Sequence, residues 1–117
     1  MQEIRVKRAD VAQVVQATFP EYRGRKIRVV PATKVHIHGL NWDGGSRNRY
    51  RGCTLSGEST GSLDKYNRCA PWSNPAEGQT VELVPGVALV KHSIFCGHDT
   101  GLRIYVHPDS IPRLLAA

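Results

Sequence analysis

The sequence lacks any long hydrophobic run, and this limits the kinds of protein that the chain can be. The longest apolar stretch, Val81 to Val90, contains Glu82 and is broken by Pro85-Gly86. It is far shorter than the roughly 20 apolar residues of a membrane-spanning helix. The start, Met1 to Arg5, is charged and has no apolar signal-peptide region behind it. We therefore expect no membrane partner.

Cysteine is scarce as well. Cys53, Cys69 and Cys96 are odd in number and widely separated, and no Cys-x-x-Cys pair occurs. This pattern fits free thiols in a reducing compartment better than a disulfide framework. We expect a cytoplasmic protein whose cysteines are small, buried apolar side chains.

Motifs of catalysis are few. The sequence has no Gly-x-Ser-x-Gly nucleophile motif and no phosphate-binding Gly-x-x-x-x-Gly-Lys. Cys96 could form a thiolate pair with His92 or His98 only if the side chains meet, and neighbours along a strand alternate faces. We assign no catalytic residue and no cofactor, and expect binding rather than catalysis.

What the chain does contain is enough apolar sequence for one folded domain over residues 1–117. Apolar residues make up 40% and charged residues 22% of its 117 residues. Burial on this scale offsets the entropy of ordering the chain.

The segment Asp10 to Phe19 has apolar residues at helical spacing, which predicts a short helix with Asp10 as N-cap and Pro20 as the stop. A second short helix is expected over Asp109 to Leu115, with Pro112 in its first turn.

Between these helices, the alternation of apolar and polar residues predicts strands. We expect them at Ile27–Val29, Val35–Ile37, Tyr50–Leu55, Thr80–Val84, Val87–Cys96 and Leu102–Val106. The first two, separated by Pro31-Ala32, form a hairpin or one kinked edge strand. Gly97 to Gly101 is expected to be the loop of a hairpin between the last two.

Short strands with only brief helices predict a mainly β (α+β) fold, a small antiparallel β-barrel or sandwich with a short helix at each end. Asn41 to Gly78 is rich in Gly, Ser, Asn and Pro. A loop of this length is uncommon in a compact domain unless it is functional or unless short strands are hidden in it.

Positive charge is unevenly distributed. The net charge is +6, and residues 1–60 contain 11 Lys and Arg against 5 Asp and Glu, whereas residues 61–117 contain 5 of each. An excess confined to one half indicates an anionic partner. The alternative is that the charge only keeps a small domain in solution.

The densest basic motif is Gly44-Gly45-Ser46 followed by Arg47, Arg49 and Arg51. On a strand the three arginines project from one face, and the glycine turn could curl its N–H groups into an anion-binding nest. Arg23 and Arg25 would extend this site if the two clusters meet. The alternative is a glycine turn leading into a solvated strand. Replacing the three strand arginines with alanine is expected to leave folding nearly unchanged.

Two aromatic residues flank this motif. Trp42 and Tyr50 could stack on bases, as aromatic side chains do in proteins that bind single-stranded nucleic acid. They could equally be core residues of a small β protein.

The histidines suggest a metal test. His36 with His38, and Cys96 with His98, are i, i+2 pairs, so each pair can lie on one face of a strand. Two such pairs on neighbouring strands could surround a tetrahedral Zn²⁺. Nothing in the sequence brings the pairs together, however. We expect exposed strand histidines with a buried thiol, and no zinc.

Three segments carry a resemblance: Trp42-Asp43-Gly44-Gly45-Ser46-Arg47, Phe95-Cys96-Gly97 and Ile104-Tyr105-Val106-His107-Pro108. With them the chain resembles small proteins encoded by bacteriophages and prophages, over roughly Val35 to Leu115. The resemblance brings no catalytic residue. It implies a binding partner or inhibitor of host machinery, or a minor virion part.

These observations rank the expected functions. A non-enzymatic module that binds nucleic acid through Arg47, Arg49 and Arg51 comes first. A phage-type inhibitor that binds an acidic host protein is second, and a binder of a phosphorylated small molecule or nucleotide is third. A zinc-assisted or cysteine enzyme is last, and a homo-oligomer stays open.

Overall fold

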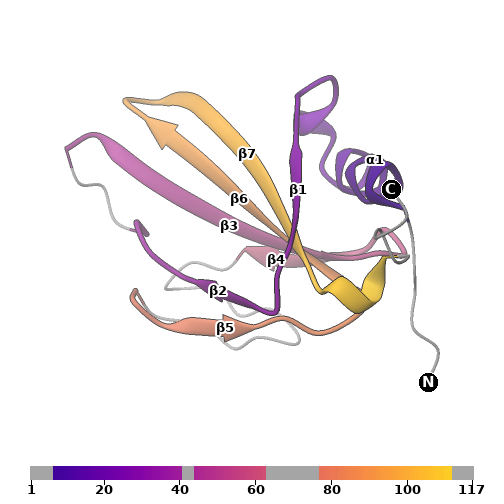
Figure 1. The fold of residues 1–117 in the computed structure, drawn as a ribbon. Coiled ribbons are helices and arrows are strands. Elements are labelled where there is room, and N and C mark those ends of the chain that lie inside the picture. Colours follow the sequence, from indigo (N-terminus) through magenta and orange to yellow (C-terminus); the bar gives the residue numbers. More distant parts are fainter. Residues whose placement is uncertain (1–6, 41–43, 63–76, 112–117) are drawn as a thin grey trace.

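The computed structural model describes residues 7–40, 44–62 and 77–111, and this part of the chain is mainly β (Figure 1). In chain order the elements are α1 (Arg8–Thr18), the 3₁₀ helix η1 (Pro20–Tyr22), β1 (Arg28–Pro31), β2 (Lys34–His36), β3 (Ser46–Thr54), β4 (Ser59–Ser62), β5 (Thr80–Glu82), β6 (Val87–Phe95), β7 (His98–Val106) and the 3₁₀ helix η2 (Pro108–Ser110). The α+β class expected from the sequence is confirmed. No helix in these ranges has the length and apolar character to span a membrane.

The strands form two sheets. The larger has the order β1-β7-β6-β3-β4, and the smaller pairs β2 with β5. β1 runs parallel to β7, whereas every other pairing is antiparallel, so the larger sheet is mixed rather than antiparallel throughout. Neither sheet closes on itself within the described ranges. Of the two architectures expected, the closed barrel is therefore wrong, and packed sheets remain.

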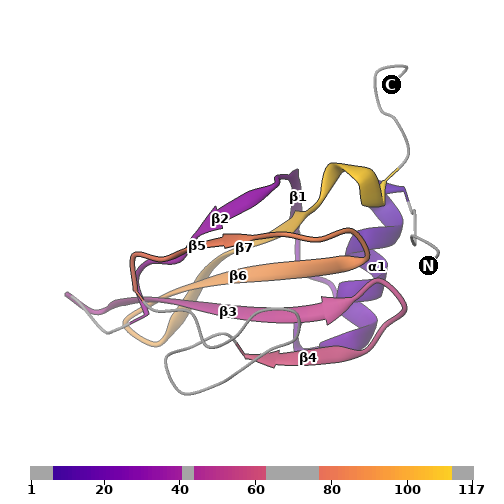
Figure 2. The same ribbon diagram turned by 90° about the horizontal axis from the view of Figure 1, so that it is seen from below.

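The larger sheet has a different covering on each face (Figures 1 and 2). On one side, which we call the helix face, α1 and η1 pack over a core that contains Val15, Phe19 and Val90. On the other, which we call the opposite face, the β2–β5 pair packs over a second core that contains Tyr50 and Leu89. Because side chains alternate along a strand, every residue of β3, β6 and β7 belongs to one face or the other.

The N-terminal helix begins earlier than expected. Its N-cap is Lys7, with no side-chain hydrogen bond to the cap, and Asp10 lies in the first turn instead. A carboxylate there still interacts favourably with the positive end of the helix dipole. Pro20 ends the helix as expected, because Phe19 before it leaves the helical conformation.

β3 and β7 begin earlier than the alternation of apolar and polar residues predicts, and β4 is an additional strand. β3 begins at Ser46, before the expected start at Tyr50, and pairs with β4, so the segment Asn41 to Gly78 contains short strands, one of the two explanations given for its length. β7 begins at His98, since the hairpin turn is Cys96-Gly97 rather than Gly97 to Gly101. Both turn residues have positive φ, 52° and 79°, as a type I′ turn requires.

β1 and β2 do not pair with each other. The chain leaves the larger sheet after Pro31 and enters the smaller one at Lys34, so the hairpin, one of the two arrangements expected for these strands, is wrong. At the other end, η2 occupies the start of the expected C-terminal helix, and His107 Nδ1 accepts a hydrogen bond from the Asp109 N–H at 3.0 Å. Residues after 111 lie outside the described ranges.

Candidate nucleic-acid interface

Arg51, the last arginine of the expected row, is part of the packing beneath the helix. Its guanidinium carbon lies 4.0 Å from the centroid of the Phe19 ring. It also donates to the Tyr22 hydroxyl at 3.3 Å and forms an ion pair with Glu21. The hydrogen bond from Arg51 lowers the pKa of the Glu21 carboxyl. Arg51 therefore holds η1 against β3, and its assignment to an open anion site is wrong.

The other two arginines of β3 have different surroundings. Arg47 is half-buried, and its Nε donates to the Leu40 carbonyl at 3.1 Å. Arg49 is exposed and lies opposite His92 of β6. The strand period is as expected, but only one of the three guanidiniums is largely in solvent. Arg47, Arg49 and Arg51 therefore do not form a row of three equivalent anion ligands.

The second basic cluster also divides. Arg23 is exposed directly after η1, whereas Arg25 is half-buried. The Arg25 N–H donates to the Tyr22 carbonyl at 3.1 Å, and its own carbonyl accepts from Gln16 at 3.0 Å. The Gln16 side chain thus ties the segment after η1 to α1.

The glycine turn before β3 has a structural role. Gly44 and Gly45 have φ values of 61° and 87°, which match the two central residues of a type I′ turn. The Gly45 carbonyl accepts the Cys96 N–H at 2.7 Å, and a Cβ on Gly45 would lie 2.9 Å from Cys96 Sγ. Glycine is thus required where this turn meets the β6–β7 turn. Ser46 begins β3 opposite Phe95.

Tyr50 cannot stack on a base. Its side chain is 0% exposed, in the core beneath the β2–β5 pair, and its hydroxyl is 3.3 Å from the His38 carbonyl. Burial raises the pKa of this phenol to about 12. The alternative stated for Tyr50, a core residue, is the one that the structure supports. Trp42 lies outside the described residues.

A set of cations that the sequence pattern did not predict lies on the opposite face. Arg28 of β1 is paired in register with Arg103 of β7, and Arg103 is paired with Lys91 of β6. Residues that are directly opposite on adjacent strands project from the same face. We call these three residues, Arg28, Arg103 and Lys91, the basic row. Arg28 and Arg103 are exposed and Lys91 is half-exposed.

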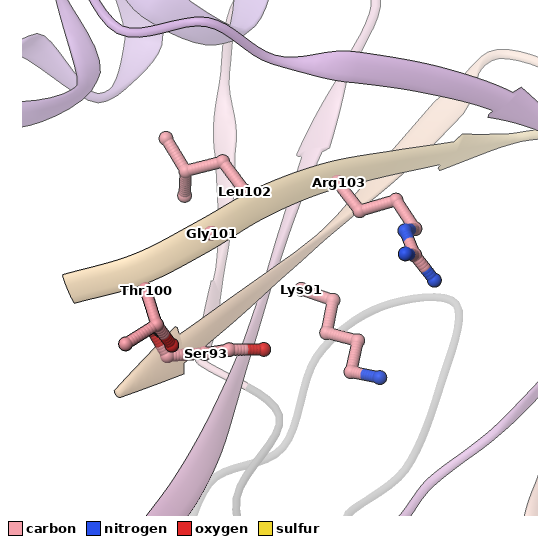
Figure 3. Close-up of a pocket in the computed structure, with 6 residues that line it drawn as sticks. All are labelled: Lys91, Ser93, Thr100, Gly101, Leu102 and Arg103. Atoms are coloured by element: carbon pink, nitrogen blue, oxygen red, sulfur yellow. The ribbon is translucent and has the colours of Figure 1, made fainter. Parts of the chain in front are cut away.

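A small pocket lies beside the basic row. It has a volume of about 170 Å³ and is lined by Lys91, Ser93, Thr100, Gly101, Leu102 and Arg103. Lys91 and Arg103 project to the same side of the two strands, and Leu102 projects to the other side, as Figure 3 shows. Among the side chains that the structure describes, no acidic one lines this pocket. Within the described ranges, no carboxylate forms an ion pair with a member of the basic row.

Two histidines border the row. His38 accepts a hydrogen bond from Lys91 Nζ at 3.2 Å, and its ring stacks on that of His36 with 5.9 Å between centroids. Burial lowers the pKa of His38, and the nearby charges of Lys91 and His36 lower it further. Glu77 acts in the other direction and raises it. Glu77 is itself occupied by the N–H groups of Gly39 and Leu40, each at 2.9 Å. Both imidazoles would add positive charge here when protonated.

The two candidate pairs of zinc ligands, His36 with His38 and Cys96 with His98, do not gather in one site. Among the residues that the structure describes, no three or more His, Cys, Asp or Glu side chains gather in one place. Cys96 is exposed in its turn beside Gly45, whereas His36 and His38 border Lys91. The expectation of a buried thiol at Cys96 is wrong. Cys53 is buried as expected, and burial raises the pKa of its thiol to about 11.

A search of family models, curated proteins and solved structures finds no match to this chain. The signal that could have found the basic row is the pairing of β1 with β7 and of β7 with β6. Arg28 ends the basic segment Arg23 to Arg28, whereas Lys91 and Arg103 have no Lys or Arg near them in the sequence, and strand register brings the three together.

Proposed function

We propose that this protein is a non-enzymatic binding module that recognises nucleic acid through the basic row on the opposite face of its larger sheet. The observation that carries the proposal is the register of Arg28, Arg103 and Lys91 across three adjacent strands. Neighbouring strands lie about 4.8 Å apart, so the row presents closely spaced cations. Arginine and lysine so placed neutralise successive phosphates of a polyanion.

The charge balance of the chain supports this choice of partner. The net charge is +6. Arg51 is paired with Glu21 and contributes to stability, whereas the basic row has no such carboxylate in the described ranges. Like charges directly opposite on adjacent strands repel each other, which costs stability. A ligand that brings negative charge to this face relieves that repulsion.

A salt titration with matched variants tests the proposal. The double variant Lys91→Ala, Arg103→Ala removes two cations from the basic row, and Arg23→Ala, Arg49→Ala removes two exposed cations elsewhere. Affinity for a labelled oligonucleotide is measured by fluorescence anisotropy across a series of salt concentrations. The slope of log affinity against log salt should fall by roughly 1.5 units in the first variant, since each phosphate contact contributes about 0.7 to 0.9.

The control variant separates the basic row from net charge. It should lose little slope, because its two cations are not in the row. Equal losses in both variants would mean that only the net charge of the protein attracts the polymer. No binding of DNA or RNA by the unmodified protein at low salt would overturn the proposal and favour a partner protein with an acidic face.

A further inference from the structure

We propose that the pocket beside Lys91 and Arg103 receives a terminal phosphate, a phosphomonoester, rather than an internal phosphodiester of the chain. This inference rests on the proposed function and makes its ligand more specific. The same chemistry has two sources, the phosphorylated end of a nucleic acid and a small phosphorylated molecule. The pocket would distinguish a phosphorylated end from the repeating backbone that the basic row contacts.

The pocket is large enough for a phosphate group but too small for a whole nucleotide. Its volume is about 170 Å³. Pockets that enclose complete small molecules have volumes of about 300 to 1,000 Å³, and a water molecule occupies about 30 Å³. A phosphate fits within these limits, and the sugar and base attached to it would lie outside along the sheet.

The donors that reach this pocket are both cations. Ser93 Oγ already donates to Asn48 Oδ1 at 3.0 Å, and Thr100 Oγ1 already donates to the Ser93 carbonyl at 3.0 Å. The hydroxyl protons are therefore used within the protein and hold the wall of the pocket in place. The Lys91 ammonium and the Arg103 guanidinium lie directly opposite each other on β6 and β7. Each gives one hydrogen bond within the protein, to His38 and to Tyr105, and keeps further N–H groups for an anion.

Two cations favour the more highly charged form of phosphate. A phosphomonoester carries about −1.5 to −2 at pH 7, whereas each internal phosphodiester carries a single negative charge. Only the monoester balances both Lys91 and Arg103 at once. An arginine guanidinium also binds phosphate oxygens through two parallel hydrogen bonds, which adds geometric selectivity.

Gly101 keeps the pocket open. It lies in β7 two residues before Arg103, so a side chain at position 101 would project from the same face as Arg103. A Cβ built there has no heavy atom within 4 Å. Glycine inside a strand marks a β-bulge or a place where another molecule approaches closely. The β6–β7 register shifts between Ser93, which lies opposite Gly101, and Ile94, so this glycine lies at a bulge that also borders the pocket. A larger residue at this position would fill the pocket while leaving every charge in place.

The decisive comparison uses one oligonucleotide with and without a terminal phosphate. Affinities of the unmodified protein and of Gly101→Val are measured for the 5′-phosphorylated, 3′-phosphorylated and unphosphorylated forms of the same sequence. The unmodified protein should bind a phosphorylated form about tenfold more tightly, as expected for one additional charge-assisted contact. Gly101→Val should lose this preference and keep its affinity for the unphosphorylated form within about twofold.

Each result has a distinct meaning. Equal affinities of the unmodified protein for all three forms would overturn the terminal-phosphate site and leave the proposed function intact. Failure of every oligonucleotide to bind would overturn the proposed function. Inorganic phosphate and a nucleoside monophosphate are then titrated by calorimetry, and binding that Gly101→Val abolishes would assign the pocket to a small molecule. Circular dichroism checks the fold of Gly101→Val, and Gly101→Ala, with its smaller side chain, replaces it if needed.

Discussion

The two faces of the larger sheet carry arginines in opposite situations. On the helix face, Arg51 packs on Phe19, pairs with Glu21 and donates to Tyr22. On the opposite face, Arg103 lies between Arg28 and Lys91, and its guanidinium donates to the Tyr105 hydroxyl at 3.4 Å. Both are arginines on strands of one sheet, yet one completes the fold and the other faces solvent among like charges.

The difference arises from what covers each face. α1 and η1 bring an aromatic pair and a carboxylate over Arg51. The β2–β5 pair brings His36 and His38 to the border of the basic row, and its nearby carboxylate, Glu77, is used by backbone N–H groups. The same residue type is thus structural or available for binding according to the element packed over it.

The largest expected effect is on the free energy of unfolding, which should depend on Arg51 much more than on Arg103. Arg51→Met should lower the free energy of unfolding by about 1 to 3 kcal/mol, because it removes a cation–π contact and a charge-assisted hydrogen bond in a half-buried position. Arg103→Met should change it by no more than about 0.5 kcal/mol, as is usual for exposed positions. Urea denaturation, with the midpoint and slope compared, measures both.

Glu21→Gln is the control for the first variant. It keeps the Arg51 contact with Phe19 and removes only the charge of the partner, so its effect should be smaller than that of Arg51→Met. If Arg51→Met and Arg103→Met were equally stable, the distinction between the two faces would be lost. The expectation that replacing Arg47, Arg49 and Arg51 together leaves folding unchanged is already inconsistent with the packing of Arg51.

Much of the fold could be predicted because it depends on local periodicity. The strand at Val87 is predicted from its content of Val, Leu and Ile, the strand at Leu102 from alternating apolar residues, and the helix end at Phe19 from Pro20. The start of β3 was missed because Ser46 to Arg49 contains no apolar residue. The parallel pairing of β1 with β7 was also missed, since it joins segments far apart in the chain.

The candidate site was harder to predict for the same reason. The arginines of β3 are conspicuous because they alternate within one strand, and strand period alone does not show that Glu21 and Phe19 lie over Arg51. The basic row depends on register across β1, β7 and β6, and its members are separated by 12 residues or more along the chain. Periodicity within a segment carries no information about register between segments.

Acid should affect the two faces at different pH values. His38 on the opposite face has a lowered pKa, caused first by burial and then by Lys91 and His36, with Glu77 acting against them. The unfolded chain then binds a proton more readily than the folded one, so stability falls as pH decreases below about 6.5 toward the lowered value. His38→Gln should remove this first loss in denaturation curves measured from pH 8 to pH 5.

The ion pair on the helix face should respond at lower pH. Arg51 lowers the pKa of Glu21 below its ordinary 4.5, so the stabilisation is present above that value and is lost as pH falls through the lowered pKa. The Leu40 and Gly39 N–H groups lower the pKa of Glu77 as well, so its stabilisation is also lost in acid. Glu21→Gln should therefore reduce the second loss without abolishing it. A single transition unaffected by either variant would contradict the assignment.

The smallest expected effect concerns the repulsion within the basic row. Lys91→Glu places a carboxylate directly opposite Arg103 and beside His38. An opposite-charge pair across strands contributes roughly 0.2 to 1 kcal/mol, so this variant should be slightly more stable than the unmodified protein in urea. The same variant should lose affinity for nucleic acid, since it reverses a charge in the proposed interface.

The smaller sheet supplies the matched control. Lys34 lies directly opposite Glu82 in the β2–β5 pair, and both are exposed. Lys34→Glu makes the same chemical change but places two carboxylates opposite each other, so it should destabilise by a similar few tenths of a kcal/mol. If Lys91→Glu raises the free energy of unfolding and Lys34→Glu lowers it, then Lys91 is repelled by its cross-strand neighbour and Lys34 is attracted by its own. If both variants change the free energy of unfolding in the same direction, the basic row carries no electrostatic cost for a ligand to relieve.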